Sequence, residues 1–252
     1  MKIKFLGTGT STGVPEIGCK CEVCTSNNIK DRRLRASVLL NIGDKRILID
    51  CGPDFREQII HEEFSHIHGV LLTHEHYDHV GGLDDLRPFC RFDDVDIYSN
   101  TITLDALKRR IPYSFREHRY PGVPTFRLHE VSHEGPFCIG DIDIQPINIM
   151  HHMLPILGYR INNFAYLTDV KHIGEEEYYK LKNLDTLVIS SLRIDKHISH
   201  LNLIEALEEI KKISPKKAYL THMSHQMGLH DKVQAILPPN VYLSYDGLEI
   251  NI

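Results

Sequence analysis

The sequence predicts an α+β fold in which two β-sheets pack face to face with helices outside them, an αββα four-layer sandwich. Strand-like runs dominate the first part of the chain, and strands alternate with helices more regularly in the second half. The clearest helix is 201–214, where apolar residues recur at the i, i+3, i+4, i+7 spacing of one helix face. With 252 residues, 42% hydrophobic and 25% charged, the whole chain 1–252 is expected to form one domain with a substantial core.

The other elements follow from local patterns. An opening strand at 2–8 leads into a turn rich in Gly, Ser and Thr at 9–15, and residues 36–42 and 45–50 flank Gly43-Asp44, a hairpin signal. The GTGTSTG run resembles a phosphate loop only superficially, since no Lys-Ser/Thr follows it. Further strands are expected at 69–73, 94–99, 125–131, 142–149, 157–162, 164–168, 186–192, 217–221 and 241–252. Further helices are expected after Pro53 and at 82–92, 103–111, 175–183 and 230–237, with a loop at 112–124.

Composition limits the classes of function. No apolar run approaches the roughly 20 residues needed to cross a bilayer, and the first residues enter a strand pattern without an apolar signal segment. We therefore expect a cytoplasmic protein with no membrane partner. The formal net charge of −5 argues against a broad nucleic-acid surface but permits a small phosphorylated substrate held by a few local cations. The 17 histidines direct attention to metal binding.

Four potential metal ligands fall within six residues, directly after the short apolar strand at 69–73. They are His74, His76, Asp78 and His79. Imidazole and carboxylate suit Zn, Mn or Fe rather than a soft metal. If 74–78 stays extended, alternate side chains project to one side, and the adjacent Asp78 and His79 diverge and can serve a second ion. A polar surface loop is a much weaker interpretation of so dense a cluster.

The run HEHYDH resembles the H-x-H-x-D-H signature of the metallo-β-lactamase superfamily. This resemblance implies His74, His76 and His152 on one catalytic ion, with His151 next to it as the competing choice. It implies Asp78, His79 and His222 on the other ion, Asp169 bridging the two, and Asp50 as a supporting carboxylate behind the ligands. Each of these later candidates follows a predicted strand, where a sheet sandwich collects side chains at one rim.

A second metal site is expected at the three clustered cysteines. Cys19, Cys21 and Cys24 have C-x-C-x-x-C spacing, and thiolates favour zinc in closed, structural sites. A closed site needs a fourth ligand, and we predict that His225, three residues after His222, supplies it. A redox cluster and plain buried cysteines are the alternatives.

The cysteine cluster and the contexts GTGTSTGVP, GYR, LTD, SHLNL, LTHMSHQ and YDG resemble the cyclic phosphodiesterases of the carbon–phosphorus lyase pathway along essentially the whole chain. That resemblance implies two divalent catalytic ions (Zn or Mn), one structural zinc, and a hydroxide shared by the two ions that attacks a small, cyclic phosphodiester. It implies catalytic roles for Asp78 and His200, with His200 touching phosphate and protonating the leaving group. The resemblance also allows a homodimer, and the sequence itself does not decide the oligomeric state.

Two further groups could contact substrate. Arg87 and Arg91 lie four residues apart on one face if 82–92 is helical, so they either bind a distal phosphate or form a solvated face. Arg116, His118 and Arg119 in the 112–124 loop either line the site or lie on the surface.

Other functions also fit parts of this sequence. A nuclease acting on DNA or RNA ends shares the metal motifs, although Asp169 follows Arg160 by only nine positions, which leaves no room there for a tRNA-clamping arm. Thioester, glyoxalase-type and lactam hydrolysis are less favoured by the cysteine cluster and SHLNL. A zinc-stabilised, non-catalytic binding module is the alternative outside enzymes, but a complete ligand set argues against it.

Overall fold

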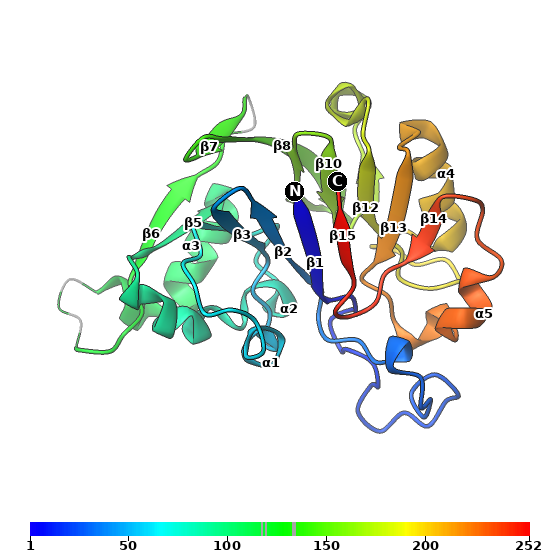
Figure 1. The fold of residues 1–252 in the computed structure, drawn as a ribbon, viewed down its shortest axis with the longest axis horizontal. Helices are drawn as coiled ribbons and strands as arrows, with labels where there is room; N and C mark the ends of the chain where they lie inside the picture. Colours follow the sequence, from blue (N-terminus) through cyan, green and yellow to red (C-terminus); the bar gives the residue numbers. More distant parts are fainter. Residues whose placement is uncertain (117, 119, 133–134) are drawn as a thin grey trace.

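Two mixed β-sheets face each other in the computed structural model, which describes residues 1–252 except 117, 119 and 133–134 (Figure 1). The first sheet has the order β15-β1-β2-β3-β4-β5-β6. Its strands are β1 (Lys2–Gly7), β2 (Ser37–Ile42), β3 (Lys45–Ile49), β4 (Gly69–Leu71), β5 (Val95–Ser99), β6 (Phe126–Glu130) and β15 (Glu249–Asn251).

The second sheet has the order β11-β8-β9-β10-β12-β13-β14, with β7 paired to β8. Its strands are β7 (Phe137–Ile139), β8 (Ile142–His151), β9 (Leu154–Ile161), β10 (Phe164–Leu167), β11 (His172–Ile173), β12 (Thr186–Ser190), β13 (Lys217–Thr221) and β14 (Val241–Leu243). The α-helices are α1 (Phe55–Ile59), α2 (Tyr77–Val80), α3 (Thr101–Arg110), α4 (Leu203–Ile213) and α5 (His230–Gln234). The 3₁₀ segments are η1 (Ile29–Asp31), η2 (Leu83–Arg91), η3 (Pro112–Phe115), η4 (Glu175–Leu181) and η5 (His225–Met227).

Both faces of each sheet are buried, which confirms the expected αββα layering. In β2, Val38 and Leu40 join the core between the sheets, whereas Leu39 joins the cluster under α3 and η2. This split follows from the two-residue period of a strand, which sends alternate side chains to opposite faces. A third cluster packs α4 onto the outer face of the second sheet. At roughly 25 cal/mol per Å² of buried apolar surface, these three clusters supply the main stabilisation.

Helix α4 forms where the pattern predicted it. Asn202 accepts a hydrogen bond from the Glu205 backbone N–H at 2.9 Å, and the Glu205 carboxylate accepts from the Asn202 N–H at 3.0 Å. This reciprocal capping box satisfies two of the backbone donors that a helix start leaves unpaired. The predicted face is buried through Leu203, Ala206 and Ile210, so propensity, capping and packing agree.

Several expected helices are tighter or shorter than predicted. Residues 83–91 and 175–181 form the 3₁₀ segments η2 and η4. Pro88 lies inside η2, where it lacks the N–H that an α-helical turn would use, so a regular α-helix there is disfavoured. No helix among the described residues is long and apolar enough to span a bilayer.

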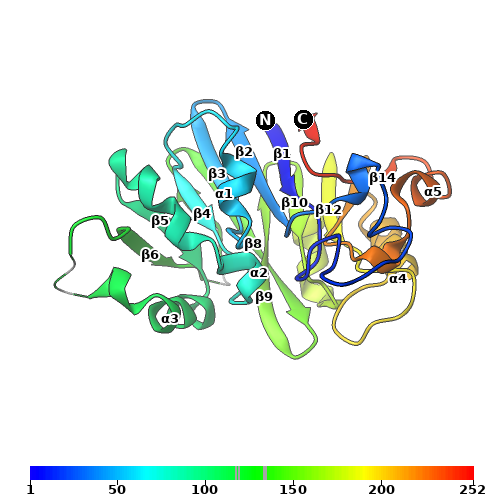
Figure 2. The same ribbon diagram turned by 90° about the horizontal axis from the view of Figure 1, so that it is seen from below.

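Strand direction brings the predicted site residues to one edge. Strands β3 and β4 are parallel, as are β10, β12 and β13. Parallel strands present their carboxyl ends at the same edge of a sheet, and polar residues follow these ends in both sheets. Figure 2, seen from below, shows α2 near the junction of the two sheets, with α3 and α4 to either side.

Candidate active site

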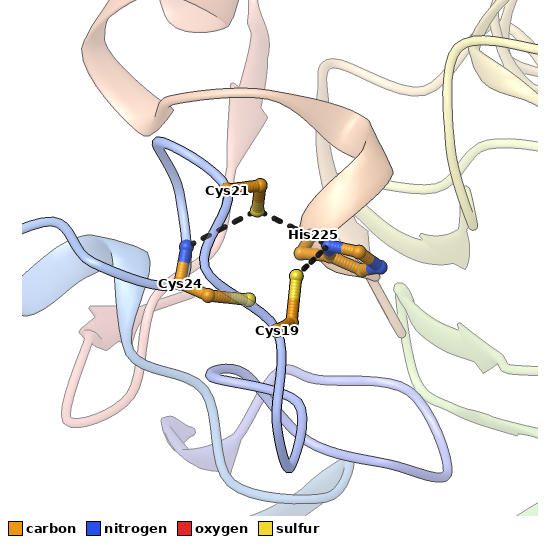
Figure 3. Close-up of side chains that lie close together, drawn as sticks. All are labelled: Cys19, Cys21, Cys24 and His225. Atoms are coloured by element: carbon orange, nitrogen blue, oxygen red, sulfur yellow. Dashed lines mark hydrogen bonds between the residues drawn. The ribbon is translucent and has the colours of Figure 1, made fainter.

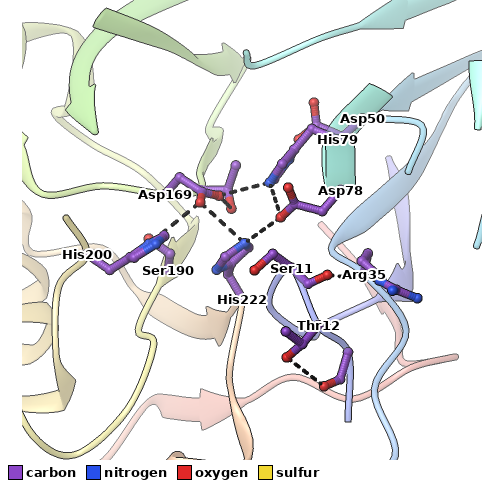
Figure 4. A network of polar contacts seen from close by, with 12 residues as sticks. Ser11, Thr12, Arg35, Asp50, Asp78, His79, Asp169, Ser190, His200 and His222 are labelled. Carbon is purple, nitrogen blue, oxygen red and sulfur yellow. Dashed lines mark hydrogen bonds and ion pairs between the residues drawn. The ribbon is translucent and has the colours of Figure 1, made fainter. Parts of the chain in front are cut away.

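Three predicted site residues adopt a left-handed backbone conformation just beyond strand ends. Asp50 follows β3, Asp169 lies two residues beyond β10, and His222 follows β13, with φ values of 60°, 54° and 57°. This region is costly for residues other than glycine and persists where the surroundings enforce it, often at functional sites. The strained turns bring these three buried side chains together at the edge where the strands end (Figure 4).

The 74–79 segment supplies imidazoles and a carboxylate to the same space. The ring centroid of His74 lies 4.5 Å from that of His76 and 4.3 Å from that of His79. Helix α2 carries Asp78 and His79, which are both buried, whereas His76 precedes the helix and is exposed. Among the proposed ligands of this segment, His76 is therefore the one that faces solvent.

Two carboxylates and two imidazoles meet in the middle of the cluster (Figure 4). The Nε2 atom of His79 lies 3.1 Å from Asp78 Oδ2 and 3.2 Å from Asp169 Oδ2. The Nε2 atom of His222 lies 3.4 Å from Asp78 Oδ2 and 3.3 Å from Asp169 Oδ1. The two oxygens of Asp169 thus face different imidazoles, which is the placement that a bridging carboxylate requires.

Asp50 and Thr73 orient the imidazoles from behind. The Asp50 carboxylate accepts hydrogen bonds from the Thr73 backbone N–H at 2.8 Å and from the Thr73 hydroxyl at 2.9 Å, and it lies 2.7 Å from His79 Nδ1. The Thr73 hydroxyl in turn lies 3.0 Å from His74 Nδ1. Such contacts place the proton of each ring on Nδ1 and turn the Nε2 lone pair inward.

The inward atoms fit metal ions. His74 Nε2 is buried without a hydrogen-bond partner, and the lone pair of His79 Nε2 faces two carboxylates. An unpaired buried acceptor costs free energy, and a lone pair facing carboxylates is repelled unless a cation lies between them. Three overlapping groups have donor atoms close enough to share an ion, and they are His74–His79–Asp169, Asp78–His79–His222 and His151–Asp169–His200. The donor set therefore suits divalent cations.

The structure corrects one predicted metal ligand. His151, the last residue of β8, is buried, and its ring centroid lies 5.2 Å from His76 and 5.7 Å from His74. Its Nδ1 lies 2.9 Å from the Ser199 carbonyl oxygen, which leaves Nε2 for a metal. His152 is exposed and begins the β8–β9 turn with a φ of 54°. His151, not His152, therefore belongs to the cluster.

The pKa values in the cluster reflect strong mutual electrostatics. Burial disfavours the charged form of His79, but Asp78, Asp50 and Asp169 outweigh it and raise the pKa of this imidazole well above its ordinary value. Burial also opposes ionisation of Asp169, yet His222 and His79 hold its pKa well below the usual range. A proton on His79 thus supplies the positive charge that a bound cation would replace, so binding would release protons.

His200 lies at the edge of this cluster. Its Nδ1 atom lies 3.6 Å from Asp169 Oδ1, and its ring is stacked on that of His222 with centroids 5.2 Å apart. Burial lowers the pKa of His200 to about 3, against the raising effect of Asp169. The imidazole is therefore neutral near pH 7 in the absence of an added anion.

The Gly/Ser/Thr turn forms part of the rim, a role that sequence reasoning missed. Thr10 N–H donates to the Met223 carbonyl at 3.1 Å, and Met223 N–H donates to the Thr8 carbonyl at 2.9 Å, so the turn is tied to the residue after His222. Figure 4 shows the Ser11 side chain beside His222, while Arg35 Nε donates to the Ser11 carbonyl at 3.1 Å. A strand-to-strand bond between distant segments leaves no local signal in the sequence.

The structure does not bring Arg87 and Arg91 to the cluster. Arg87 donates to both carboxylate oxygens of Asp84 at 2.8 and 3.0 Å, on a surface where both side chains are exposed. Arg91 is also exposed, and the two arginines share a separate cavity with Gly122 and Val123. The solvated-face interpretation fits them. Arg116 and His118 are exposed as well, and Arg119 lies outside the described residues.

The predicted thiolate site is assembled as expected (Figure 3). His225 Nδ1 lies 3.2 Å from Cys21 Sγ and 3.4 Å from Cys19 Sγ, and the donor atoms of these residues and Cys24 all lie within 4.8 Å of one another. Glu16 contacts His225 Nε2 at 3.1 Å and so directs Nδ1 toward the sulfurs. The backbone N–H of Cys24 and the His225 ring lower the pKa of Cys21 to about 6, which favours a thiolate.

Comparison with known proteins agrees with this geometry. A family model described as a beta-lactamase superfamily domain matches residues 45–223, and the chain belongs to the metallo-β-lactamase superfamily, a class of hydrolases whose fold typically binds divalent metals such as zinc. Within it, the chain falls in the PhnP family. A crystal structure of a diphosphatase from that family has a TM-score of 0.92 and 36% sequence identity, covering 100% of this chain and 97% of the other.

Two curated relatives carry different names. An octanoyltransferase from Porphyromonas gingivalis is 46% identical over 251 residues, which are 99% of this chain and 51% of that protein. A ribonuclease Z from Nostoc punctiforme is 28% identical over 193 residues, 73% of this chain and 52% of that protein. The chain thus spans about half the length of each relative, so their names do not by themselves describe it.

Proposed function

We propose that this chain is a dinuclear metal-dependent phosphodiesterase that hydrolyses small phosphodiesters. The observation that carries the proposal is the convergence of imidazoles and carboxylates from five strand ends and loops, with buried Nε2 atoms that lack partners. The proposed ligand sets are His74, His76 and His151 for one ion and Asp78, His79 and His222 for the other, with Asp169 between them. The ions are two divalent cations, zinc or manganese, and the thiolate site takes a structural zinc.

Such cations, when bound, would lower the pKa of a coordinated water and withdraw charge from a phosphoryl group. The protein's contribution is to hold the donors in fixed orientations. Asp50 and Thr73 lock the rings of His74 and His79, and the Ser199 carbonyl locks that of His151. Preorganised groups of this kind spend little reorganisation energy as charge develops in the reaction.

The opening of the site and the relatives support this substrate class. His76 and the exposed rim residues Ser11 and Thr12 leave the cluster accessible to a small ligand. The PhnP-family neighbour is described as a diphosphatase, which supports chemistry at a phosphoryl group. Acyl transfer, the activity in the name of the P. gingivalis relative, is not assigned to this chain, because the donors here are imidazole and carboxylate and Cys51 is buried with a raised pKa.

His200 is proposed as the residue that protonates the leaving group. Its position beside Asp169 and His222 places it at the edge of the proposed metal centre, and a phosphoryl anion next to it would stabilise the imidazolium.

Replacing His200 by Ala should therefore lower the rate of alkyl-ester hydrolysis by about 10²-fold, whereas p-nitrophenyl esters, whose leaving group needs little protonation, should lose far less. Steady-state kcat values for both ester types check this. Equal losses for the two would discredit the role.

The test of the whole proposal is a set of rate measurements on metal-loaded protein. Bis-p-nitrophenyl phosphate should be hydrolysed with Mn or Zn and not after chelation. A side-by-side comparison of 5-phosphoribosyl 1,2-cyclic phosphate, 2′,3′-cyclic AMP, a nucleoside diphosphate and a short single-stranded oligonucleotide then identifies the substrate class. Preference for the oligonucleotide would favour a nuclease, and no metal-dependent turnover of any compound would favour a binding module.

A further inference from the structure

A charged groove lies directly beside the metal loop, outside the cluster described above. It is lined by Glu75, Ala106, Arg109 and Arg110 and has a volume of about 280 Å³. Glu75 stands between His74 and His76 in the chain, so one wall of the groove is the metal-binding loop itself. The other wall is the C-terminal half of α3, on which positions 106, 109 and 110 share one face. We propose that this groove is a subsite for a second phosphate group of the substrate, an inference that rests on the proposed phosphodiesterase function.

The charges in the groove favour an anion. Arg109 and Arg110 are both exposed, and within the described part of the chain neither forms an ion pair with a carboxylate within 4.0 Å. The neighbouring Lys108, by contrast, is paired with Asp105 at 3.0 Å. Glu75 opposes the two arginines with one negative charge, which leaves a net positive charge in a protein whose total is −5. Guanidinium groups match phosphate oxygens in a two-pronged geometry that lysine does not offer.

Tyr77 holds one of these arginines close to the metal loop. The Arg110 guanidinium lies 5.8 Å from the centre of the Tyr77 ring, a cation–π distance, and Tyr77 lies between the proposed ligands His76 and Asp78. A Cβ on Gly81 would come within 2.8 Å of the Tyr77 ring, so the glycine is what allows the ring to fold back over α2. Tyr77 itself is 61% exposed and forms an open edge of the same region.

The position of the groove matches a substrate with two phosphates. His76 is the exposed ligand at the mouth of the cluster, and Glu75 and Tyr77 flank it in the chain. A phosphodiester bound at the cluster and a second phosphate in the groove would thus lie on adjacent residues of one loop. Arg87 and Arg91, which sequence reasoning suggested for such a phosphate, line a different cavity.

The test compares one cyclic ester with and without its distal phosphate. Ribose 1,2-cyclic phosphate and its 5-phosphorylated form are assayed with wild-type protein, with the double variant Arg109→Gln/Arg110→Gln, and with Lys108→Gln as the matched control on the same helix end. We expect kcat/KM of the double variant to fall about tenfold or more for the phosphorylated ester and to stay within about twofold for the other. Lys108→Gln should leave both values unchanged.

Calorimetric titration with ribose 5-phosphate gives a second readout that does not require turnover. Its affinity should fall in the double variant and not in Lys108→Gln. If wild-type protein hydrolyses neither ester yet shows this affinity pattern, the proposed phosphodiesterase function fails while the subsite stands. If the double variant loses activity equally on both esters, or keeps full activity and affinity toward the phosphorylated compounds, the subsite is refuted.

Discussion

Replacing His151 by Ala should remove one catalytic ion and lower metal-dependent phosphodiester hydrolysis by more than about 100-fold. Changing a group that merely supports a metal ligand typically costs 10–100-fold, so loss of a ligand should cost at least as much. His151 is buried against His74, His76 and His200, and its Nδ1 is already engaged by the Ser199 carbonyl. Elemental analysis and kcat of the purified variant check the two halves of this expectation.

His152→Ala is the matched control, because the residue is chemically identical, adjacent in sequence and exposed. It should bind the same number of ions as wild-type protein and hydrolyse substrate at the same rate. A reversed pattern, with His152→Ala inactive and His151→Ala normal, would show that the cluster takes its third imidazole from the turn and that the assignment above is wrong.

The choice between His151 and His152 could not be made from the family motif alone. The family motif places a histidine before Gly158-Tyr159 but does not distinguish neighbours. The strand pattern does, because Ile147 and Ile149 are buried and the two-residue period of β8 puts His151 on the same side. The hairpin pairs His151 with Leu154, which leaves His152 and Met153 as the exposed turn.

Most other features of the fold and the site could be predicted, because they depend on residues close together in the sequence. The dense 74–79 cluster, the polar residues beyond buried strands and the C-x-C-x-x-C spacing each follow from short sequence patterns, as does helix α4. The features that could not be predicted depend on contacts with residues far away in the sequence, or on a neighbouring side chain that engages the residue first. Arg87 is held by Asp84 rather than by a phosphate site, and the turn at 9–13 is placed at the rim by backbone pairing with distant residues, Met223 among them.

The second large effect should come from the thiolate site. Replacing Cys21 by Ser should abolish binding of one zinc and lower the midpoint of thermal unfolding by about 6–12 °C. A ligand present at 100 times its Kd stabilises the folded state by about 3 kcal/mol, and each kcal/mol corresponds to roughly 2–4 °C for a chain of this size. The loop around the cysteines buries few apolar side chains, Val14 and Val23 among them, so the ion is expected to contribute much of its stability.

Cys138→Ser is the control for this change, because Cys138 is an exposed cysteine far along the chain from the cluster. It should keep all bound zinc and the wild-type unfolding midpoint. A Cys21→Ser variant with wild-type zinc content and stability would mean that the three thiols and His225 do not hold a structural ion.

Loss of the zinc ion held by the thiolates should also weaken metal binding at the catalytic centre. His225 follows His222 by three residues, and Met223 between them is bonded through its backbone to the turn at Thr8 and Thr10. A loosened His225 therefore relaxes the segment that holds His222 in its left-handed conformation. We expect Cys21→Ser to raise the concentration of Mn or Zn needed for half-maximal activity, with activity largely restored at saturating metal. His222→Ala, which removes the ligand itself, should not be rescued by added metal, and that contrast separates a displaced ligand from a missing one.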